Sequence, residues 1–243
     1  MKDKKVLIVG LGKSGVAAMK AALDRGAIVS VQDRKKQEDL DREILDMLKG
    51  NRVRAFLGRE PEDMGEYDMV ILSPGAPVDI PFVLEARACG AEIIGELELA
   101  FRLANGRFIG ITGTNGKTTT TTLVGEIFKA ASRRTSVVGN IGTPVLTAIE
   151  GSDEDSWFVT EVSSFQLETC SEFRPEVSAI LNLTPDHLDR HGTFENYGRT
   201  KARIFMCQSP DQYCVVNADD ENVMALMEEC PAKPIPFSRK NKL

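Results

Sequence analysis

Short apolar runs alternate with longer amphipathic segments over the first part of the chain. The apolar runs lie at 6–9, 28–31 and 69–72, and an amphipathic segment at 14–25 separates the first two. Short strands joined by helical crossovers favour a parallel sheet covered on both faces, because each such connection needs a dozen residues or more. The pattern therefore predicts a Rossmann-like α/β domain over residues 1–93.

The same alternation restarts after a segment at 95–101 that resembles a connecting helix, so we place the domain boundary between residues 93 and 106. The strands predicted beyond it lie at 108–111, 136–138, 157–162, 177–181 and 213–216. A second α/β domain is therefore expected over residues 94–243. The polar run at 238–243 closes no strand or helix, and we expect this domain to be incomplete.

A glycine-rich loop separates the strand at 108–111 from a helix-compatible segment that begins at Lys117. Residues 110–119 read Gly-Ile-Thr-Gly-Thr-Asn-Gly-Lys-Thr-Thr. Glycines let successive N–H groups point at phosphate oxygens beside the positive end of the helix. Lys117 supplies a cation for the outer phosphates, and the Thr118 hydroxyl is placed to bind Mg²⁺.

This order of strand, loop and helix favours a P-loop-type ATP site over a glycine-rich turn with a solvated lysine. One position departs from the strict motif, because Ile111 stands where a glycine is expected. We call residues 113–119 the phosphate loop. The residues expected to contact the nucleotide are Gly113, Thr114, Asn115, Gly116, Lys117, Thr118 and Thr119.

Composition narrows the class of protein. The chain has 243 residues, of which 42% are hydrophobic, enough for two domains with ordinary cores. Its net charge of −6 offers no broad basic surface for nucleic acid, and no apolar run is long enough to span a bilayer. Five cysteines without CxxC spacing favour reduced thiols over disulfides or a zinc site. We expect a cytoplasmic protein without an export signal.

A second glycine cluster, Gly-Leu-Gly-Lys-Ser-Gly at 10–15, follows the first predicted strand, and Asp33 ends the next one. This is the dinucleotide fingerprint, in which pyrophosphate lies at the helix N-terminus and the acid binds ribose hydroxyls. The same turn can hold any diphosphate, and Arg34 would add positive charge for a uridine diphosphate sugar. A nicotinamide or flavin dinucleotide, a UDP-sugar and a purely structural turn all stay open.

Three further segments accompany the phosphate loop. They read Gly-Asn-Ile-Gly-Thr-Pro at 139–144, Glu-Val-Ser-Ser-Phe-Gln-Leu-Glu at 161–168, and Asn-Leu-Thr-Pro-Asp-His-Leu-Asp-Arg-His at 182–191. In this order, and together with the phosphate loop, they resemble the Mur ligases of bacterial peptidoglycan synthesis. The resemblance covers essentially the whole chain.

The resemblance implies ATP-driven amide formation. A substrate carboxylate attacks the γ-phosphate of ATP, and the amine of an incoming amino acid then displaces phosphate from the acyl phosphate. Because carboxylate and triphosphate are both anions, metal ions and lysines must neutralise them. The Ser-Ser-Phe-Gln-Leu-Glu string at 163–168 is similar to that of family members that add D-glutamate to UDP-N-acetylmuramoyl-L-alanine.

The resemblance also implies roles for single residues. It implies that Thr118 and Glu161 bind the Mg²⁺ that bridges the outer phosphates, and that His187 and a carbamylated Lys201 hold a second Mg²⁺. The expected catalytic residues are Lys117, Glu161, His187 and Lys201. The expected substrate-binding residues are Lys13, Ser14, Asp33, Arg34, Ser73, Gly75, Asn140 and His187. His191 has no matching role, and we interpret it as structural.

Members of this family have a third, C-terminal domain that binds the incoming amino acid, and we expect it to be absent here. The chain should then have little or no ligase activity alone, and we separately expect a monomer. Two other functions stay open, a nicotinamide-dependent oxidoreductase and a non-catalytic UDP-sugar-binding module. The first of these leaves the phosphate loop, Glu161 and His187 without a role.

Overall fold

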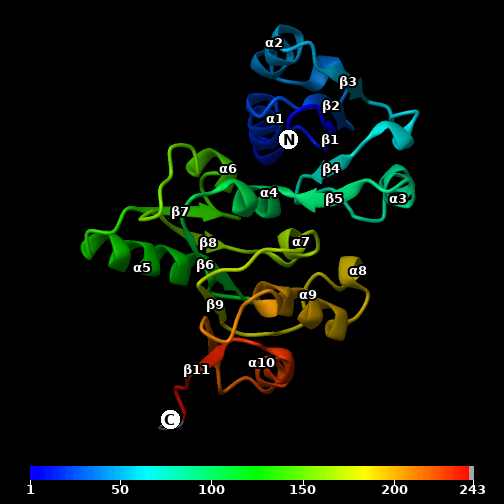
Figure 1. The fold of residues 1–243 in the computed structure, drawn as a ribbon. Coiled ribbons are helices and arrows are strands. Elements are labelled where there is room, and N and C mark those ends of the chain that lie inside the picture. Colours follow the sequence, from blue (N-terminus) through cyan, green and yellow to red (C-terminus); the bar gives the residue numbers. More distant parts are fainter. Residues whose placement is uncertain (241–243) are drawn as a thin grey trace. The chain divides into compact units, whose positions relative to one another are not determined.

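The computed structural model describes residues 1–240 in two compact units, the first of residues 1–99 and the second beginning at Ala100 (Figure 1). Helix α4 (Glu96–Leu103) contains this division. Both units are parallel α/β structures, which confirms the fold class predicted from the sequence. The expected connecting helix at 95–101 corresponds to α4.

The first unit is built on a five-stranded parallel sheet with the order β3-β2-β1-β4-β5. Its strands are β1 (Lys5–Val9), β2 (Ile28–Asp33), β3 (Arg54–Leu57), β4 (Met69–Leu72) and β5 (Glu92–Gly95). Its helices are α1 (Lys13–Asp24), α2 (Arg42–Gly50) and α3 (Pro81–Ala88), with short 3₁₀ turns at Gln37–Asp39 and Met64–Glu66. The central strand β1 is buried from Val6 to Val9, as expected for a parallel strand covered on both faces.

The direction in which strands are added reverses beside β1, because β2 and β3 lie on one side of it and β4 and β5 on the other. Such a switch point leaves a crevice beyond the carboxyl ends of the strands, where α/β proteins bind their ligands. The glycine cluster at 10–15 lies at this point, since it connects β1 to α1.

The second unit contains a six-stranded parallel sheet with the order β11-β10-β9-β6-β8-β7 (Figure 1). Its strands are β6 (Arg107–Thr112), β7 (Thr135–Gly139), β8 (Trp157–Glu161), β9 (Val177–Ile180), β10 (Tyr213–Asn217) and β11 (Lys233–Phe237). Its helices are α5 (Lys117–Ala130), α6 (Val145–Ala148), α7 (Ser164–Leu167), α8 (Leu188–His191), α9 (Phe194–Met206) and α10 (Glu221–Leu226), followed by a 3₁₀ turn at Met227–Glu229.

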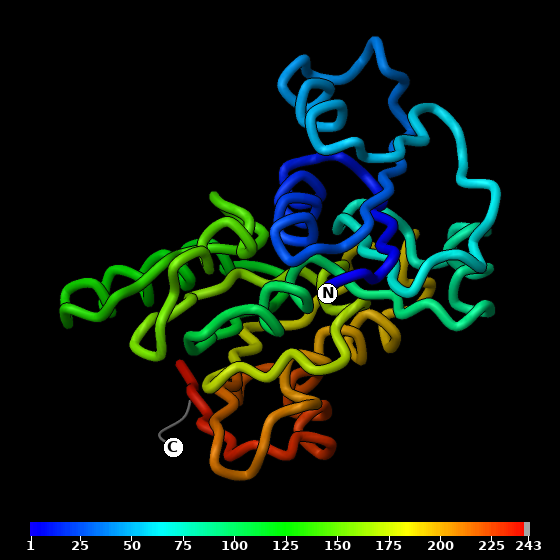
Figure 2. The backbone as a smooth tube through the Cα atoms, turned by 45° about the horizontal axis from the view of Figure 1, so that its top comes forward, coloured from blue at the N-terminus to red at the C-terminus, as the bar shows by residue number. Residues whose placement is uncertain are grey.

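Helices α5 and α9 cover opposite faces of this sheet. Ile109 and Ile111 of β6 pack in one cluster with Val124 and Phe128 of α5. Gly110, which lies between the two isoleucines, approaches Ile204 of α9 instead. Successive residues of a strand point to opposite faces, so the two helices enclose β6. Helix α10 packs against α9 (Figure 2).

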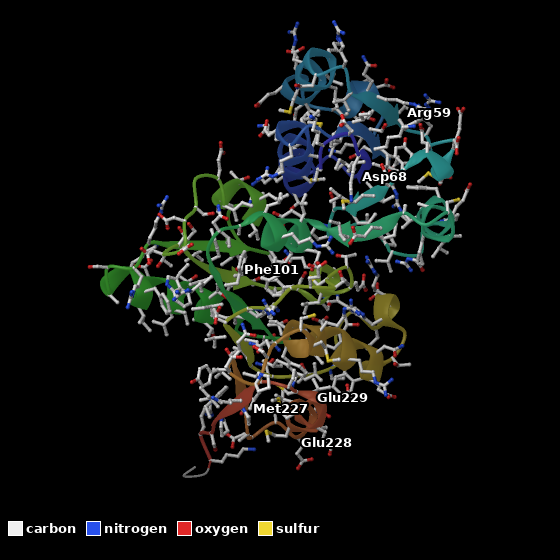
Figure 3. All side chains as sticks on the ribbon, in the orientation of Figure 1. Arg59, Asp68, Phe101, Met227, Glu228 and Glu229 are labelled. Atoms are coloured by element: carbon white, nitrogen blue, oxygen red, sulfur yellow. The ribbon has the colours of Figure 1, made fainter. Side chains whose placement is uncertain are left out.

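Aromatic rings fill the core on the α9 side of the sheet. Phe108 contacts Phe158 at 4.9 Å between ring centroids, and Phe101 and Phe173 at 5.7 and 5.8 Å. Phe101, labelled in Figure 3, comes from the end of α4. Edge-on contacts of this kind add to the hydrophobic stabilisation of the rings. This core holds β6 and β8 in place. The phosphate loop follows β6, and Glu161 ends β8.

Strand β11 is an edge strand that the hydrophobic pattern does not predict. It reads Lys-Pro-Ile-Pro-Phe, pairs with β10 and is exposed along its whole length. Prolines argue against a strand because they lack an N–H group, yet they are tolerated at sheet edges. The edge position of β11 explains why Pro234 and Pro236 are accommodated.

Candidate functional site

The phosphate loop leaves the carboxyl end of β6 and leads directly into α5. Gly113 has a φ of +148°, and a Cβ atom there would lie 3.1 Å from Leu181 Cβ and 3.3 Å from Asn182 N. A larger residue would therefore meet both a strained backbone angle and the strand end beside it. Lys117 Nζ donates to the carbonyl oxygens of Gly113 and Thr114 at 3.0 and 2.8 Å. The loop is thus folded around its own lysine.

Thr118 and Glu161 meet at the start of α5. Thr118 Oγ1 donates to Glu161 Oε2 at 2.7 Å, and Asn140 Nδ2 donates to Glu161 Oε1 at 3.1 Å. Glu161 ends β8 and is only 2% exposed, while Asn140 follows β7. The structure therefore brings together three of the residues that the sequence singles out.

These groups fit a magnesium ion. Among residues 1–240 the buried Glu161 carboxylate accepts hydrogen bonds from a hydroxyl and an amide, and no ion pair with a cationic side chain is described for it. A buried carboxylate without a compensating cation is costly. Mg²⁺ is bound in proteins by one or two carboxylates together with phosphate oxygens and water. Over the same residues, no group of three or more His, Cys, Asp or Glu side chains is placed to hold a metal.

Lys201 lies on the inner face of α9, only 2% exposed. Its Nζ donates to Gly113 O at 2.9 Å and to Thr112 Oγ1 at 3.3 Å, and it lies 4.8 Å from the centre of the Tyr197 ring. Burial, reinforced by the charge of Lys117, lowers the pKa of Lys201 from 10.5 to about 7. A fraction of this amine is therefore neutral at physiological pH.

His187 stands apart from the Thr118–Glu161 pair. It caps α8 in a left-handed conformation with a φ of +50°, and its side chain is 51% exposed. Its ring lies 4.9 Å from the Phe165 ring, and Nε2 is 3.6 Å from Asp186 Oδ2. No hydrogen bond described for residues 1–240 joins the His187 side chain to Glu161 or Lys201.

His191, which the sequence analysis interprets as structural, is buried between α7 and α9. Its Nε2 lies 3.0 Å from Ser164 Oγ, its Nδ1 lies 3.6 Å from Glu168 Oε1, and its ring stacks on Phe165. Burial lowers the pKa of His191, with the nearby Glu168 acting in the opposite direction. These contacts tie α7 to α8 beside His187.

The first unit has its own cavity, of about 440 Å³, at the switch point beside β1. Its walls include Asp33, Arg34, Ser73 and Gly75, four residues predicted from the sequence, as well as Gln32 and Arg59, which the sequence analysis did not single out. Arg59 is labelled in Figure 3. Lys13 and Ser14 begin α1 and do not line this cavity.

Asp33 and Ser73 fix the glycine turn at the edge of the cavity. The Asp33 carboxylate accepts hydrogen bonds from Leu11 N at 2.6 Å and Lys35 N at 2.8 Å. Ser73 Oγ donates to Gly10 O at 3.0 Å. A Cβ atom on Gly15 would lie 1.8 Å from that same carbonyl oxygen, so α1 can approach the turn only with glycine there. Asp33 thus already shapes the turn before any ligand binds.

The sequence analysis gave no role to two residues that contact the phosphate loop in the second unit. Asn182 contacts the phosphate loop with its side chain and its backbone, and the Tyr197 hydroxyl lies 3.3 Å from Thr114 Oγ1. For Asn182 the usable signal was its position two residues beyond the apolar run that forms β9 (Val177–Ile180). For Tyr197 the signal was its spacing of four residues from Lys201 on one helix face.

No helix among residues 1–240 is long and apolar enough to cross a membrane. Two parallel sheets, a glycine loop at the start of α5 and a hydroxyl–carboxylate pair beside it are the features of an α/β protein of the P-loop type.

The comparison with known families then identifies the group. Residues 111–243 match the Mur ligase middle domain, and residues 4–95 match the MurD-like N-terminal domain of Mur ligases. The chain belongs to the Mur ligase family.

Curated relatives agree with this assignment. The UDP-N-acetylmuramoylalanine–D-glutamate ligase of Clostridioides difficile (strain 630) is 56% identical over 245 residues, covering 100% of this chain and 54% of that protein. The enzyme of the same name from Alkaliphilus metalliredigens (strain QYMF) is 49% identical over 246 residues, with the same coverage. The chain thus spans about half the length of the curated relatives it matches.

Solved structures share the fold. The UDP-N-acetylmuramate:L-alanyl-gamma-D-glutamyl-meso-diaminopimelate ligase from Neisseria meningitides aligns with a TM-score of 0.61 at 18% identity, covering 97% of this chain and 78% of that one. The UDP-N-acetylmuramate-alanine ligase MurC from Thermotoga maritima aligns with a TM-score of 0.52 at 22% identity, covering 98% and 53%. At these identities the likeness concerns the fold alone.

Proposed function

We propose that this chain is the part of a cytoplasmic ATP-dependent amide ligase that binds ATP and UDP-N-acetylmuramoyl-L-alanine, and that the complete enzyme adds D-glutamate to this substrate. The names of the curated relatives support the substrate pair. The single observation that carries the ATP site is the hydrogen bond from Thr118 to the buried Glu161 carboxylate beside the phosphate loop. We assign D-glutamate binding to the part of the relatives that lies outside this chain, and we expect a monomer.

In the reaction we propose, a carboxylate oxygen of the sugar-nucleotide substrate attacks the γ-phosphorus of ATP, and ADP leaves. The amine of D-glutamate then attacks the acyl carbon, phosphate leaves, and the amine loses a proton as the amide forms. Both steps bring anions together, so positive groups have to neutralise the phosphates.

The chain supplies these groups around the phosphate loop. Two of the three donors of Lys117 Nζ are directed at carbonyl oxygens of the loop, so we expect Lys117 to redirect donors to phosphate oxygens when the nucleotide binds. Thr118 and Glu161 would hold the first Mg²⁺. When bound, this ion screens the charge between the outer phosphates and the approaching carboxylate.

We further propose that Lys201 carries a carbamate and that, with His187, it would hold a second Mg²⁺. A neutral lysine amine adds to carbon dioxide, gives up a proton and becomes an anion. The support is the burial of Lys201, its uncharged hydrogen-bond acceptors and its lowered pKa. The exposed His187 would have to approach this group upon ligand binding.

For the sugar nucleotide we propose the cavity of the first unit. Arg34, which lines it, offers a cation for a diphosphate, and Ser73 and Gly75 line it as well. Lys13 and Ser14, at the start of α1, could add donors at the helix N-terminus. Asn140, in the second unit beside Glu161, is proposed separately as a contact of the muramoyl-alanine arm. Membership of the Mur ligase family favours this ligand over a nicotinamide dinucleotide.

Calorimetry on the chain tests the proposal. Mg-ATP and UDP-N-acetylmuramoyl-L-alanine should each bind, and NADH should not. Lys117→Ala should weaken Mg-ATP binding by about tenfold to a hundredfold, because a charge-assisted contact to phosphate is lost. Lys129→Ala is the matched control, since Lys129 lies on the same helix in an exposed ion pair with Glu126. Unchanged ATP affinity in Lys117→Ala, or NADH binding in place of the sugar nucleotide, would refute the assignment.

A further inference from the structure

The phosphate loop is joined by hydrogen bonds to the segment that follows β9. Asn115 N donates to Asn182 Oδ1 at 2.8 Å, and Asn182 Nδ2 donates to Asn115 O at 2.9 Å. Thr114 N donates to the Asn182 carbonyl at 3.0 Å. The Asn182 side chain therefore pairs with both polar groups of one loop residue, as a neighbouring strand would.

The next residues extend this junction. Thr184 N donates to Thr114 Oγ1 at 3.0 Å, and Thr114 Oγ1 also lies 3.1 Å from the Thr184 carbonyl, to which it can donate. On the other side of Asn182, Leu181 N donates to Thr112 O at 3.0 Å. The close approach of Gly113 to Leu181 and Asn182 lets the two segments lie this near to each other.

The segment after β9 is itself held from the side away from the phosphate loop. Asn217 Nδ2 donates to Leu181 O at 3.0 Å, and Asp220 Oδ2 accepts from Leu183 N at 2.8 Å. Asp220 also caps α10 through Asn222 N and Val223 N. The segment is therefore anchored independently of the phosphate loop, and Asn182 is its side-chain contact with Asn115.

These bonds decide which N–H groups of the phosphate loop can face a ligand. The N–H groups of Thr114 and Asn115 are committed to Asn182. The N–H groups at the start of α5 lack the intrahelical partner that later residues of a helix have. We therefore expect the N–H groups from Gly116 onward to bind the phosphate oxygens. The backbone of Thr114 and Asn115 would hold these N–H groups in position.

We propose that Asn182 is a positioning residue for ATP binding, one that holds the Asn115 peptide so that the following N–H groups face the phosphates. The inference rests on the proposed ATP site. The side-chain amide matches both groups of the Asn115 backbone, because it carries an acceptor and a donor on two separate atoms. Asparagine and not aspartate is required, since a carboxylate would place negative charge against Asn115 O.

The experiment compares three variants of the chain by calorimetry and thermal unfolding. Asn182→Ala should bind Mg-ATP about tenfold more weakly than the wild type, as expected from losing about two hydrogen bonds that preorganise the loop. Asn182→Asp keeps the acceptor and loses the donor, so it should also bind Mg-ATP more weakly than the wild type. It provides the same test if the alanine variant does not fold. Neither substitution should change the affinity for UDP-N-acetylmuramoyl-L-alanine, for which we propose the first unit.

Asn217→Ala is the matched control, because it removes the amide that holds the same segment from the far side. It should lower the unfolding temperature to a similar extent while leaving ATP affinity within about twofold of the wild type. Equal losses of ATP affinity in Asn182→Ala and Asn217→Ala, or no loss in Asn182→Ala, would overturn the inference while the ATP site stands. A wild-type chain that binds no ATP would overturn both.

Discussion

The buried Lys201 predicts an unusual dependence of stability on pH. Its pKa is about 7 in the folded chain and 10.5 when exposed, and at about 1.4 kcal/mol for each pKa unit this amounts to about 5 kcal/mol. Because the folded pKa is the lower one, the unfolded chain binds more protons between about pH 7 and 10.5. Stability contributed by this group therefore rises with pH across that window and is constant below it.

Replacing Lys201 with methionine should remove this dependence. Met fills a similar volume without a charge, so Lys201→Met should be more stable than the wild type by a few kcal/mol at pH 7, after about 1 kcal/mol is subtracted for each lost hydrogen bond. The advantage should shrink by about 1.4 kcal/mol per pH unit, vanish near pH 9 and reverse above it. Urea denaturation of both proteins at several pH values, in buffer free of carbon dioxide, measures the difference.

The difference in free energy of unfolding between the wild type and Lys201→Met reports the titration of Lys201, because all other groups titrate in both proteins. Lys129→Met, at an exposed position of α5, should give a curve parallel to the wild type. Adding bicarbonate should stabilise the wild type and leave Lys201→Met unchanged if the amine forms a carbamate. Parallel pH curves for the wild type and Lys201→Met would refute the reasoning, because they would mean that Lys201 keeps an ordinary pKa when folded.

Two further outcomes are expected. Gly113→Ala should destabilise the second unit by about 2 kcal/mol, because the new Cβ meets Leu181 and the backbone of Asn182 at a φ of +148°; thermal unfolding measures this, and a loss below about 0.5 kcal/mol would show that the loop relaxes freely. Arg34→Ala should weaken binding of UDP-N-acetylmuramoyl-L-alanine by about tenfold and leave Mg-ATP binding unchanged, because a charge-assisted contact to the diphosphate is lost. Calorimetry with both ligands compares the two affinities, and equal losses would contradict separate sites.

Most of the fold followed from local patterns. Parallel strands buried on both faces read as continuous apolar runs, so the strands at 108–111 and 157–162 were predictable and are confirmed as β6 and β8. Strand β11 was not, because two prolines conceal a strand whose existence depends on pairing with β10. Pairing with a distant segment is invisible to a pattern read along the chain.

The site was predictable where a motif defines a local geometry and not where distant segments meet. The phosphate loop and its Thr118 follow from glycine spacing before a helix, whereas the pairing of Thr118 with the distant Glu161 was implied by the resemblance to the Mur ligases. The pairing of Asn182 with Asn115 depends on the register between β6 and β9, which the sequence does not reveal. The role of Asp33 in holding the glycine turn likewise required coordinates.

The two prolines of β11 determine what its outer edge can bind. Lys233 N points inward and donates to Gln212 O, so by the alternation of a strand the N–H positions of residues 234 and 236 point outward. Both are prolines, and this stretch of the edge therefore exposes carbonyl acceptors without backbone donors. A strand from another molecule could satisfy only half of the usual ladder there. Among residues 1–240 no strand pairs with this edge, and its lack of backbone donors makes it a poor template for intermolecular sheet growth.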